Sequence, residues 1–402
     1  MTTEPRTERA NLWVVCAAQF LTLAGMTAIL PLIPLYLQDI GVVERDAVRY
    51  WTGILGSAPF IVAVFATPVW GAFADRFGHK PMVVRSVFGI AIATVGMGFA
   101  SSPLALLGWR GLQGAVSGVF PAAVALLSSS TPPPRVGRAL AILQSARAAG
   151  SLCGPLIGGV LADLLGMRLL FFGVGTLATL TAVLCTLVLH EPARAGGADS
   201  AAASRREVRQ RDLLADRPTL AMLTLLVLFQ VMIMASWPSL ALFVEKLGVS
   251  RDAVATTTGL VIFVAGVPAM FISTAWARLG TKFGVERMML TSLILSGLSY
   301  AAVGFFAHRV EVLFGLRLIS GVSLAGFVPL SFHWMGMRAP ENARGRMAGL
   351  ASTAMMVGNV IGPLLGGWLA VHLELAATFY VPGTALALIG IAFAAVSAVR
   401  RA

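Results

Sequence analysis

The sequence predicts an all-α polytopic membrane protein with twelve transmembrane helices in two pseudo-symmetric six-helix bundles, and three observations support this fold class. The 402-residue chain is 57% hydrophobic and only 12% charged, whereas soluble domains carry about 25% charged residues. It contains twelve apolar runs of the length that crosses a bilayer, about 20 residues each. Landmarks in its first half return about 207 residues later. A chain this apolar requires lipid as its solvent.

The apolar runs lack the sustained alternation of a membrane β-strand, so each one predicts a helix. The first run is too long for the core of a signal peptide and is expected to be the first span. The predicted spans cover residues 12–37, 51–73, 82–100, 104–128, 139–162, 168–190, 219–243, 254–276, 287–307, 311–335, 347–370 and 377–398.

The clearest internal repeat is glycine-rich. Gly-Pro-Leu-Ile-Gly-Gly at residues 154–159 returns as Gly-Pro-Leu-Leu-Gly-Gly at 362–367. Membrane proteins built from two copies of one bundle usually have their working site where the copies meet, so the repeat points to transport. Two other landmarks recur at nearly the same offset: Arg110 as Arg317, and the loop at 75–78 as a weaker copy at 281–284.

Residues 191–217 form the only long polar interruption. They predict a cytoplasmic linker between an N-terminal bundle (1–190) and a C-terminal bundle (218–402), with a short surface helix at 205–216. The other loops are short, as expected for closely packed antiparallel helices. The sequence Thr-Pro-Pro-Pro at 131–134 predicts a non-helical boundary.

The basic charge follows the membrane topology. The net charge is +12, and 21 of the 30 Lys and Arg residues fall on one predicted side, six on the other and three inside spans. This asymmetry places both termini in the cytoplasm and favours a bilayer whose inner leaflet is anionic, so no nucleic-acid partner is implied. The three cysteines lie in apolar runs and predict neither a metal site nor a disulfide framework.

Three motifs resemble those of a known family. Residues 71–80 read Gly-Ala-Phe-Ala-Asp-Arg-Phe-Gly-His-Lys, and this stretch resembles the cytoplasmic loop motif of the major facilitator superfamily. Residues 110–114 match the family's fourth-span motif, and residues 150–159 match the fifth-span motif of its exporting branches. The resemblance covers about residues 11–398 and is closest to bacterial multidrug-resistance transporters of the twelve-helix drug:proton antiporter-1 type. It implies a bacterial inner-membrane protein that uses a proton gradient and no cofactor.

The loop motif is expected to act as a conformational latch. Gly71 would let the second span approach a neighbouring helix, and Asp75 would accept hydrogen bonds from the N-terminus of the eleventh span, near residues 346–349. Such a contact would form only when the cytoplasmic side is closed and would bias a two-state equilibrium; the alternative is a solvated turn. His79 replaces the arginine usual in the family, and residues 125–130 lack the acid of the family's charge relay. The predicted latch residues are Gly71, Asp75, Arg76, Gly78 and Lys80.

Arg110 is predicted to lie inside the membrane. An arginine at the span centre costs at least about 2.5–3.5 kcal/mol, so it needs a polar environment, and Gln113 lies one turn away. The resemblance implies a role in proton transfer or cavity polarity, and snorkelling to the outer surface is the alternative. The predicted intramembrane polar or proton-linked residues are Arg110, Gln113 and Arg317.

Glycines recur every four residues in the fifth and eleventh spans, with a proline beside each set. Small residues at this spacing allow backbones to touch, and proline allows a bend. We interpret these positions as a seam between the two bundles; static packing inside a bundle is the alternative. The predicted seam residues are Gly150, Gly154, Pro155, Gly158, Gly159, Gly358, Gly362, Pro363 and Gly366.

Arg147 has no counterpart in the second half, where Met355 stands. This asymmetry predicts contact with an acidic or acceptor-rich part of a substrate, and the alternatives are backbone carbonyls or snorkelling. Methionine and aromatic surfaces adapt to varied apolar ligands. The predicted cavity is lined by Gln19, Met26, Gln144, Arg147, Gln230, Met234, Trp237, Phe263, His333 and Asn359.

No proton carrier is evident. All eighteen acids fall in loops or at span ends, and the first span lacks the acid that many relatives carry there. Proton coupling is therefore implied by the resemblance alone. The remaining candidates are Asp39, Asp75, Glu245, Glu311 and His333.

The sequence thus predicts a secondary active efflux transporter that works by alternating access. It would exchange protons for small amphipathic drugs or toxic compounds, as a monomer. One rival is an exporter of a single metabolite, such as a sugar, siderophore or lipid precursor. A non-transporting membrane sensor lacks an attached soluble domain, and an enzyme lacks a nucleophile–base pair, metal cluster or phosphate loop at workable spacing.

Overall fold

The computed structural model describes residues 4–191, 215–340 and 343–399. The secondary structure in these ranges is helical throughout. Twelve helical segments there are long and apolar enough to cross a membrane, one for each predicted apolar run, which confirms the all-α polytopic fold. Residues 192–214, which hold most of the predicted linker and of its surface helix, lie outside the described residues.

The helices of the N-terminal half begin and end at residues that the apolar runs place only approximately. They are α1 (Glu4–Ile29), the 3₁₀ turn η1 (Leu30–Leu32), α2 (Ile33–Asp39), α3 (Arg45–Phe77), α4 (His79–Gly98), α5 (Pro103–Ala115), α6 (Val119–Ser130), α7 (Pro133–Leu165) and α8 (Met167–Val188).

The C-terminal half has six spans as well, of which the first ends before a short separate helix. Its helices are α10 (Arg217–Ser236), α11 (Leu240–Lys246), the 3₁₀ turn η2 (Arg251–Ala253), α12 (Val254–Phe283), α13 (Val285–Phe306), α14 (Val310–Arg338), α15 (Arg344–His372) and α16 (Ala377–Val399).

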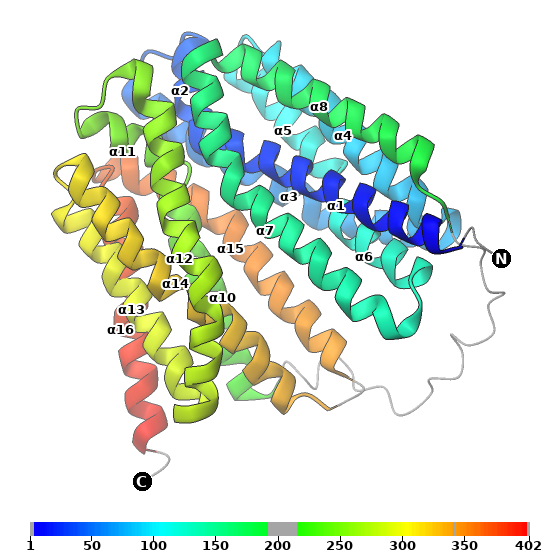
Figure 1. Ribbon diagram of the computed structural model, residues 1–402. Coiled ribbons are helices and arrows are strands. Elements are labelled where there is room, and N and C mark those ends of the chain that lie inside the picture. The colour runs from blue at the N-terminus through cyan, green and yellow to red at the C-terminus, as the bar shows by residue number, and fades with distance from the viewer. Residues whose placement is uncertain (1–3, 192–214, 341–342, 400–402) are drawn as a thin grey trace. The chain divides into compact units, whose positions relative to one another are not determined.

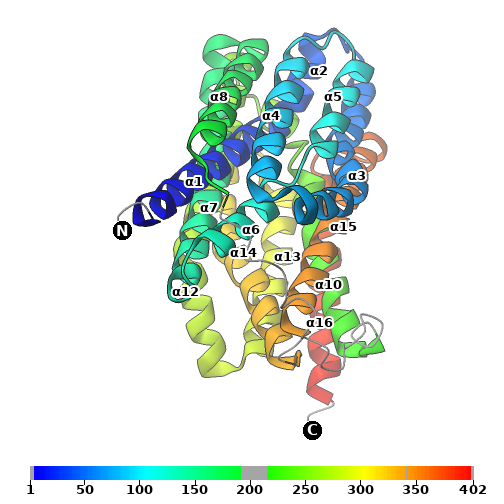
Figure 2. The same cartoon turned by 90° about the vertical axis from the view of Figure 1, so that its right-hand side faces the viewer.

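The chain forms two compact units. Unit 1 contains Met1–Ala195 and Ser250–Leu260, and unit 2 contains Gly196–Val249 and Val261–Ala402. Inside unit 1, α1 lies along α7 and also contacts α8, α4 packs on α8, and α3 packs on α5 (Figure 1). Inside unit 2, α10 lies along α15, and α13 packs between α14 and α16 (Figure 2). The first two turns of α12 therefore pack with unit 1 and the rest of α12 with unit 2.

Short turns with glycine separate several helices. Gly78 ends α3 and precedes α4, and Gly284 stands between α12 and α13; both have φ +97°, which side chains with a Cβ rarely adopt. The non-helical boundary predicted at residues 131–134 is only half right, because α7 begins at Pro133. Proline fits the first turn of a helix, where its missing N–H would have no partner.

The two halves repeat specific contacts as well as sequence. Trp70 Nε1 donates a hydrogen bond to the carbonyl of Ala115 at 2.6 Å, and in the second half Trp276 Nε1 donates to the carbonyl of Val322 at 2.9 Å. The sequence offsets are 206 and 207 residues. Corresponding pairs of helices are thus held by the same side-chain bond, which supports the duplicated architecture.

The interior of unit 1 is built from small and aliphatic side chains. A buried cluster joins residues of α1, α4, α6, α7 and α8, with Cys16 and Cys185 among them. All three cysteines are free thiols, and no disulfide links them. The polar residues described next lie beside this apolar interior.

Candidate functional site

Arg110 is enclosed in the N-terminal half. Its side chain is 2% exposed, so it does not snorkel. Nε donates a hydrogen bond to the carbonyl of Leu55 on α3 at 3.0 Å, and Nη1 donates to Oε1 of Gln113 at 2.7 Å. Gln113, one turn away in the sequence, thus supplies one acceptor, and α3 supplies the second. No carboxylate contacts this arginine among the described residues, so its charge is solvated by dipoles.

The repeat counterpart Arg317 has a different environment. It is 5% exposed, and its guanidinium carbon lies 5.3 Å from the ring centre of Tyr300. Ser320 occupies the position of Gln113. Among the described residues, Nε and Nη1 of Arg317 have no hydrogen-bond partner. The two halves therefore share a buried arginine but not the way in which it is satisfied.

The fourth span is broken, whereas its counterpart is continuous. Helix α5 ends at Ala115 and α6 begins at Val119, with Gly118 at φ +120° between them. Figure 2 shows α5 and α6 as two separate helices. The tenth span, α14, runs without a break from Val310 to Arg338. Broken membrane helices expose backbone groups that need partners from elsewhere in the protein.

Two side chains satisfy the carbonyls at this break. Trp70 donates to Ala115, as described above, and Arg85 Nη2 donates to the carbonyl of Ser117 at 3.1 Å and to Oγ of Ser86 at 2.7 Å. The guanidinium of Arg85 stacks 3.5 Å from the Trp70 ring centre. Sequence reasoning missed both residues, because a tryptophan in a span resembles ordinary packing and Arg85 was counted among the cytoplasmic charges. The recurrence of tryptophan 206 residues later was the available signal.

Arg147 lies next to the same break. Its guanidinium carbon is 4.4 Å from the ring centre of Phe120, in the first turn of α6. This distance is that of a cation–π contact. The half-buried side chain thus has an aromatic partner inside unit 1, and its predicted role in substrate binding stays a proposal. Gln144, one turn earlier, is exposed.

Most of the glycines predicted to form a seam between the bundles pack inside one half instead. A Cβ at Gly150 or Gly154 would lie 2.4 Å from the backbone oxygen of Phe20 or Ala24 on α1, and one at Gly158 would lie 2.4 Å from the Cβ of Ala28. These glycines therefore pack α7 on α1, inside the N-terminal half. Spacing identifies a face of small residues but does not say which helix it meets.

The second set of glycines behaves in the same way. A Cβ at Gly358, Gly362 or Gly366 would come within 2.0–2.5 Å of atoms on α10, so these residues pack α15 on α10 inside the C-terminal half. Pro155 and Pro363 are buried within α7 and α15. Two of the nine predicted seam residues meet the start of α12: a Cβ at Gly159 would lie 2.2 Å from the backbone oxygen of Ala255, and a Cβ at Gly259 would lie 2.2 Å from the backbone oxygen of Pro155.

The loop motif is only partly described. The side chain of Asp75 lies outside the described residues, so the predicted latch stays a proposal. A Cβ at Gly71 would meet no described atom within 4 Å, and the close helix approach predicted there stays a proposal. Arg76 lies 5.4 Å from the ring centre of Phe77.

A carboxylate that the sequence analysis assigned to the linker holds the end of this loop. Oε1 of Glu191 accepts a hydrogen bond from the backbone N–H of His79 at 2.8 Å, and Oε2 accepts one from Lys80 at 2.5 Å. Glu191 thereby caps the N-terminus of α4, where an anion is favoured. Glycine is favoured at position 78 by its φ of +97°, and a Cβ there would also lie 2.7 Å from Oε1 of Glu191.

In the second half, the structure brings together three predicted cavity residues. Gln230 Nε2 on α10 donates to Oδ1 of Asn359 on α15 at 2.7 Å. Met234, one turn along α10, packs on Gly362, where an added Cβ would lie 2.4 Å from the Met234 Cβ. An amide pair and a methionine therefore lie side by side at the α10–α15 contact, with the polar pair bonded to itself.

The other predicted cavity residues are spread over several helices. Gln19 is 4% exposed, and its Oε1 has no partner among the described residues. Met26 is half-buried against the core of unit 1. Trp237 and Phe263 are half-buried, and His333 is exposed. A cavity formed jointly by the two halves stays a proposal.

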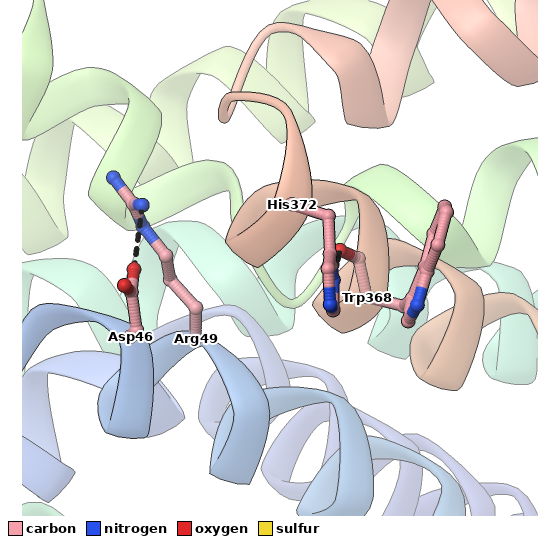
Figure 3. A network of polar contacts seen from close by, with 4 residues as sticks. All are labelled: Asp46, Arg49, Trp368 and His372. Atoms are coloured by element: carbon pink, nitrogen blue, oxygen red, sulfur yellow. Dashed lines mark hydrogen bonds and ion pairs between the residues drawn. The ribbon is translucent and has the colours of Figure 1, made fainter.

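Polar contacts at other helix ends have a local role. Arg49 Nη1 and Asp46 Oδ1 form a 3.0 Å ion pair in the first turn of α3. In α15, the His372 ring stacks on Trp368 with ring centres 4.7 Å apart, and its Nδ1 lies 3.0 Å from the Trp368 carbonyl oxygen. Figure 3 shows these two pairs. No group of three or more His, Cys, Asp or Glu side chains that could hold a metal occurs among the described residues.

Comparison with known proteins agrees with the fold and its duplication. The family model described as Major Facilitator Superfamily matches residues 15–273 and 231–402. The chain is 30% identical over 382 residues to multidrug resistance protein MdtG of Proteus mirabilis, covering 94% of each chain. It is 32% identical over 372 residues to the uncharacterized MFS-type transporter YuxJ of Bacillus subtilis, covering 90% of this chain and 92% of that one.

Solved structures show the same fold. A bacterial homologue of the human lysosomal transporter Spinster superposes with a TM-score of 0.74 at 17% identity, over 96% of this chain and 94% of that one. A D-xylose–proton symporter gives 0.76 at 14% identity, over 96% and 97%. The chain is therefore a multi-pass transporter of the bacterial inner membrane rather than an enzyme, and it belongs to the major facilitator superfamily.

Proposed function

We propose that this transporter expels small amphipathic compounds from the cell in exchange for protons. The observation that carries this proposal is the 30% identity to a multidrug resistance protein over 94% of both chains. Identity spread over the whole length includes the helices that would line a substrate path, so it supports a shared task as well as a shared fold.

The side chains of each half are consistent with broad recognition. Methionine side chains and aromatic rings adjust to ligands of varied shape, and Met234 and Phe120 are of this kind. Two polar groups among them have partners inside the protein: Gln230 donates to Asn359, and the guanidinium of Arg147 lies over the Phe120 ring. Polar groups paired in this way make few directional demands on a substrate.

The proton gradient is sufficient to drive such export. One proton moving down 100 mV releases about 2.3 kcal/mol, and a tenfold concentration ratio corresponds to about 1.4 kcal/mol. One proton per neutral substrate molecule therefore sustains a gradient of roughly fifty-fold, which gives a useful degree of resistance.

The breadth of export is tested in drug-sensitive cells that express the chain, with a panel of structurally unrelated amphipathic compounds. We expect resistance to several of them, and resistance to one compound class alone would favour the rival exporter of a single metabolite. Proton exchange is tested separately in proteoliposomes with an imposed pH gradient. Substrate should release protons from the lumen, and substrate movement without proton movement would contradict the antiport.

Arg147 provides a residue-level test of substrate contact. We expect Arg147→Ala to change the relative resistance to anionic and cationic compounds, because the charge beside Phe120 is lost. The matched control is Arg49→Ala, which removes an arginine from an ion pair at the start of α3. Unchanged resistance to every compound, at equal protein amounts, would remove Arg147 from the substrate site.

A further inference from the structure

Asp163, in the last turn of α7, holds the beginning of α12. Its Oδ2 accepts a hydrogen bond from the backbone N–H of Thr256 at 2.7 Å, and its Oδ1 accepts one from Ala255 at 3.2 Å. Both amides lie in the first turn of α12, where backbone N–H groups have no partner within the helix and the helix dipole favours a negative charge. One carboxylate therefore satisfies two donors, and all three residues belong to unit 1.

The two helices touch backbone to backbone beside this cap. A Cβ at Gly159, one turn before Asp163, would lie 2.2 Å from the carbonyl oxygen of Ala255. A Cβ at Gly259 of α12 would lie 2.2 Å from the carbonyl oxygen of Pro155. Neither position has room for a side chain, so both glycines are needed for the amides of α12 to reach the carboxylate.

A second, independent contact ties the same segment to the N-terminal half. Arg251, in the 3₁₀ turn before α12, places Nη2 2.9 Å from Oδ1 of Asp39 at the end of α2. Its Nη1 also donates to Oε1 of Gln38. Residues 250–260 are accordingly part of unit 1, although residues 251–260 form the beginning of the eighth span.

The contacts of Asp163 and Arg251 lie at one end of α7 and α12, and this position indicates a role in the transport cycle. They join α7 to the first turns of α12, which belong to unit 1, whereas the rest of α12 belongs to unit 2. The predicted topology, with both termini in the cytoplasm, places this end of both spans on the outer side. In a transporter whose halves rock against each other, a contact between spans of different halves at one end has to open once in every cycle.

We propose that Asp163 and the N-terminus of α12 form the outer latch of the transport cycle, closed while the outer side is shut and broken when it opens. This proposal rests on the alternating access of the proposed function. It has the same chemistry as the latch predicted for Asp75: a carboxylate at the end of a span in the first half caps a helix N-terminus of the second half. Asp163 escaped the sequence analysis because an acid at a span end resembles an interfacial charge.

The latch is tested by the accessibility of α12 in the full-length protein in nanodiscs. Thr258 is fully buried and follows the capped turn, so the reporter is Thr258→Cys, labelled with a membrane-impermeant maleimide. Cys16 and Cys153 are replaced by serine. The native Cys185, which is fully buried in α8, stays as an internal reporter of general unfolding.

Three variants are compared in this background: Asp163→Asn, Asp163→Ala and, as the matched control, Asp252→Asn. Asp252 is an exposed acid in the same segment. We expect Asp163→Ala to label at residue 258 about tenfold faster, which corresponds to about 1.4 kcal/mol and lies within the range for lost helix caps. Asp163→Asn keeps one acceptor oxygen and should label at a rate between those of Asp163→Ala and the control. The control and Cys185 should label at unchanged rates.

Two results would overturn the latch. Equal labelling of Asp163→Ala and the control would show that the cap does not hold the segment. Faster labelling of Cys185 together with residue 258 would show that Asp163 only stabilises the fold. The measurement uses no substrate, so a latch that behaves as expected together with failed drug export would refute the proposed substrates and leave the latch standing.

Discussion

Substituting Gly154 by alanine is a sensitive test of the packing of α1 on α7. The added Cβ would lie 2.4 Å from both the carbonyl oxygen of Ala24 and Oγ1 of Thr27. Contacts of this kind are normally at least about 3.4 Å, so the helices have to separate by about 1 Å. The hydroxyl of Thr27 can rotate away, but the carbonyl of Ala24 is backbone and cannot.

The magnitude follows from two opposing effects. Overpacking a tight interior by one methyl group costs about 1–3 kcal/mol, whereas replacing glycine by alanine inside a helix gains up to about 1 kcal/mol. We therefore expect Gly154→Ala to lower the free energy of unfolding by about 1–2 kcal/mol. The matched control is Gly173→Ala in α8, where a Cβ would meet no described atom within 4 Å, so only the gain applies.

The two variants are compared by thermal unfolding in detergent, with the unsubstituted protein alongside. Gly154→Ala should melt below it, and Gly173→Ala should melt at or above it. The same comparison is available in the second half with Gly362→Ala and the open position Gly315. If Gly154→Ala melts as high as Gly173→Ala, then α1 and α7 are not in backbone contact and the reasoning is refuted.

Two further predictions concern a turn and a polar pair. Gly78→Ala should lower the free energy of unfolding by about 1 kcal/mol more than Gly284→Ala. The two glycines share φ +97°, but only Gly78 adjoins the Glu191 cap. Equal melting temperatures of the two variants would contradict the contact with Glu191. Gln230 and Asn359 are replaced by leucine singly and together, and the three variants are compared by thermal unfolding. The coupling energy between the two substitutions should be about 0.6–1.7 kcal/mol. Strictly additive effects would mean that the 2.7 Å hydrogen bond contributes nothing to stability.

The sequence was sufficient for the spans and the duplication because both depend on properties that a linear pattern carries. An apolar run of about 20 residues has few alternatives to a membrane helix, and a repeated glycine motif is visible without coordinates. Helix ends were predicted less well. Helix α3 begins at Arg45 and α7 at Pro133, six residues outside their apolar runs, because polar residues continue a helix beyond the hydrocarbon.

The candidate site was harder to predict because its contacts depend on direction. Glycine spacing in α7 indicated a packing face, but the partner of Gly150, Gly154 and Gly158 is α1, and only Gly159 among these glycines meets α12. Gln113 was found because it lies one turn from Arg110, whereas Leu55 acts through its carbonyl, which no side-chain pattern reveals. Glu191 and Asp163 cap helices distant in sequence, and only the fold brings each acid to its amides.

The broken fourth span is a structural difference between the two halves of the duplicated fold. In the ninth span, Thr291 stands where the first half has Arg85, and the tenth span, α14, continues through the turn that corresponds to the break. The helix break between α5 and α6 therefore has no counterpart in α14. A protein assembled from two identical copies of either half would have two such breaks or none, so the two halves are not structurally interchangeable at this point.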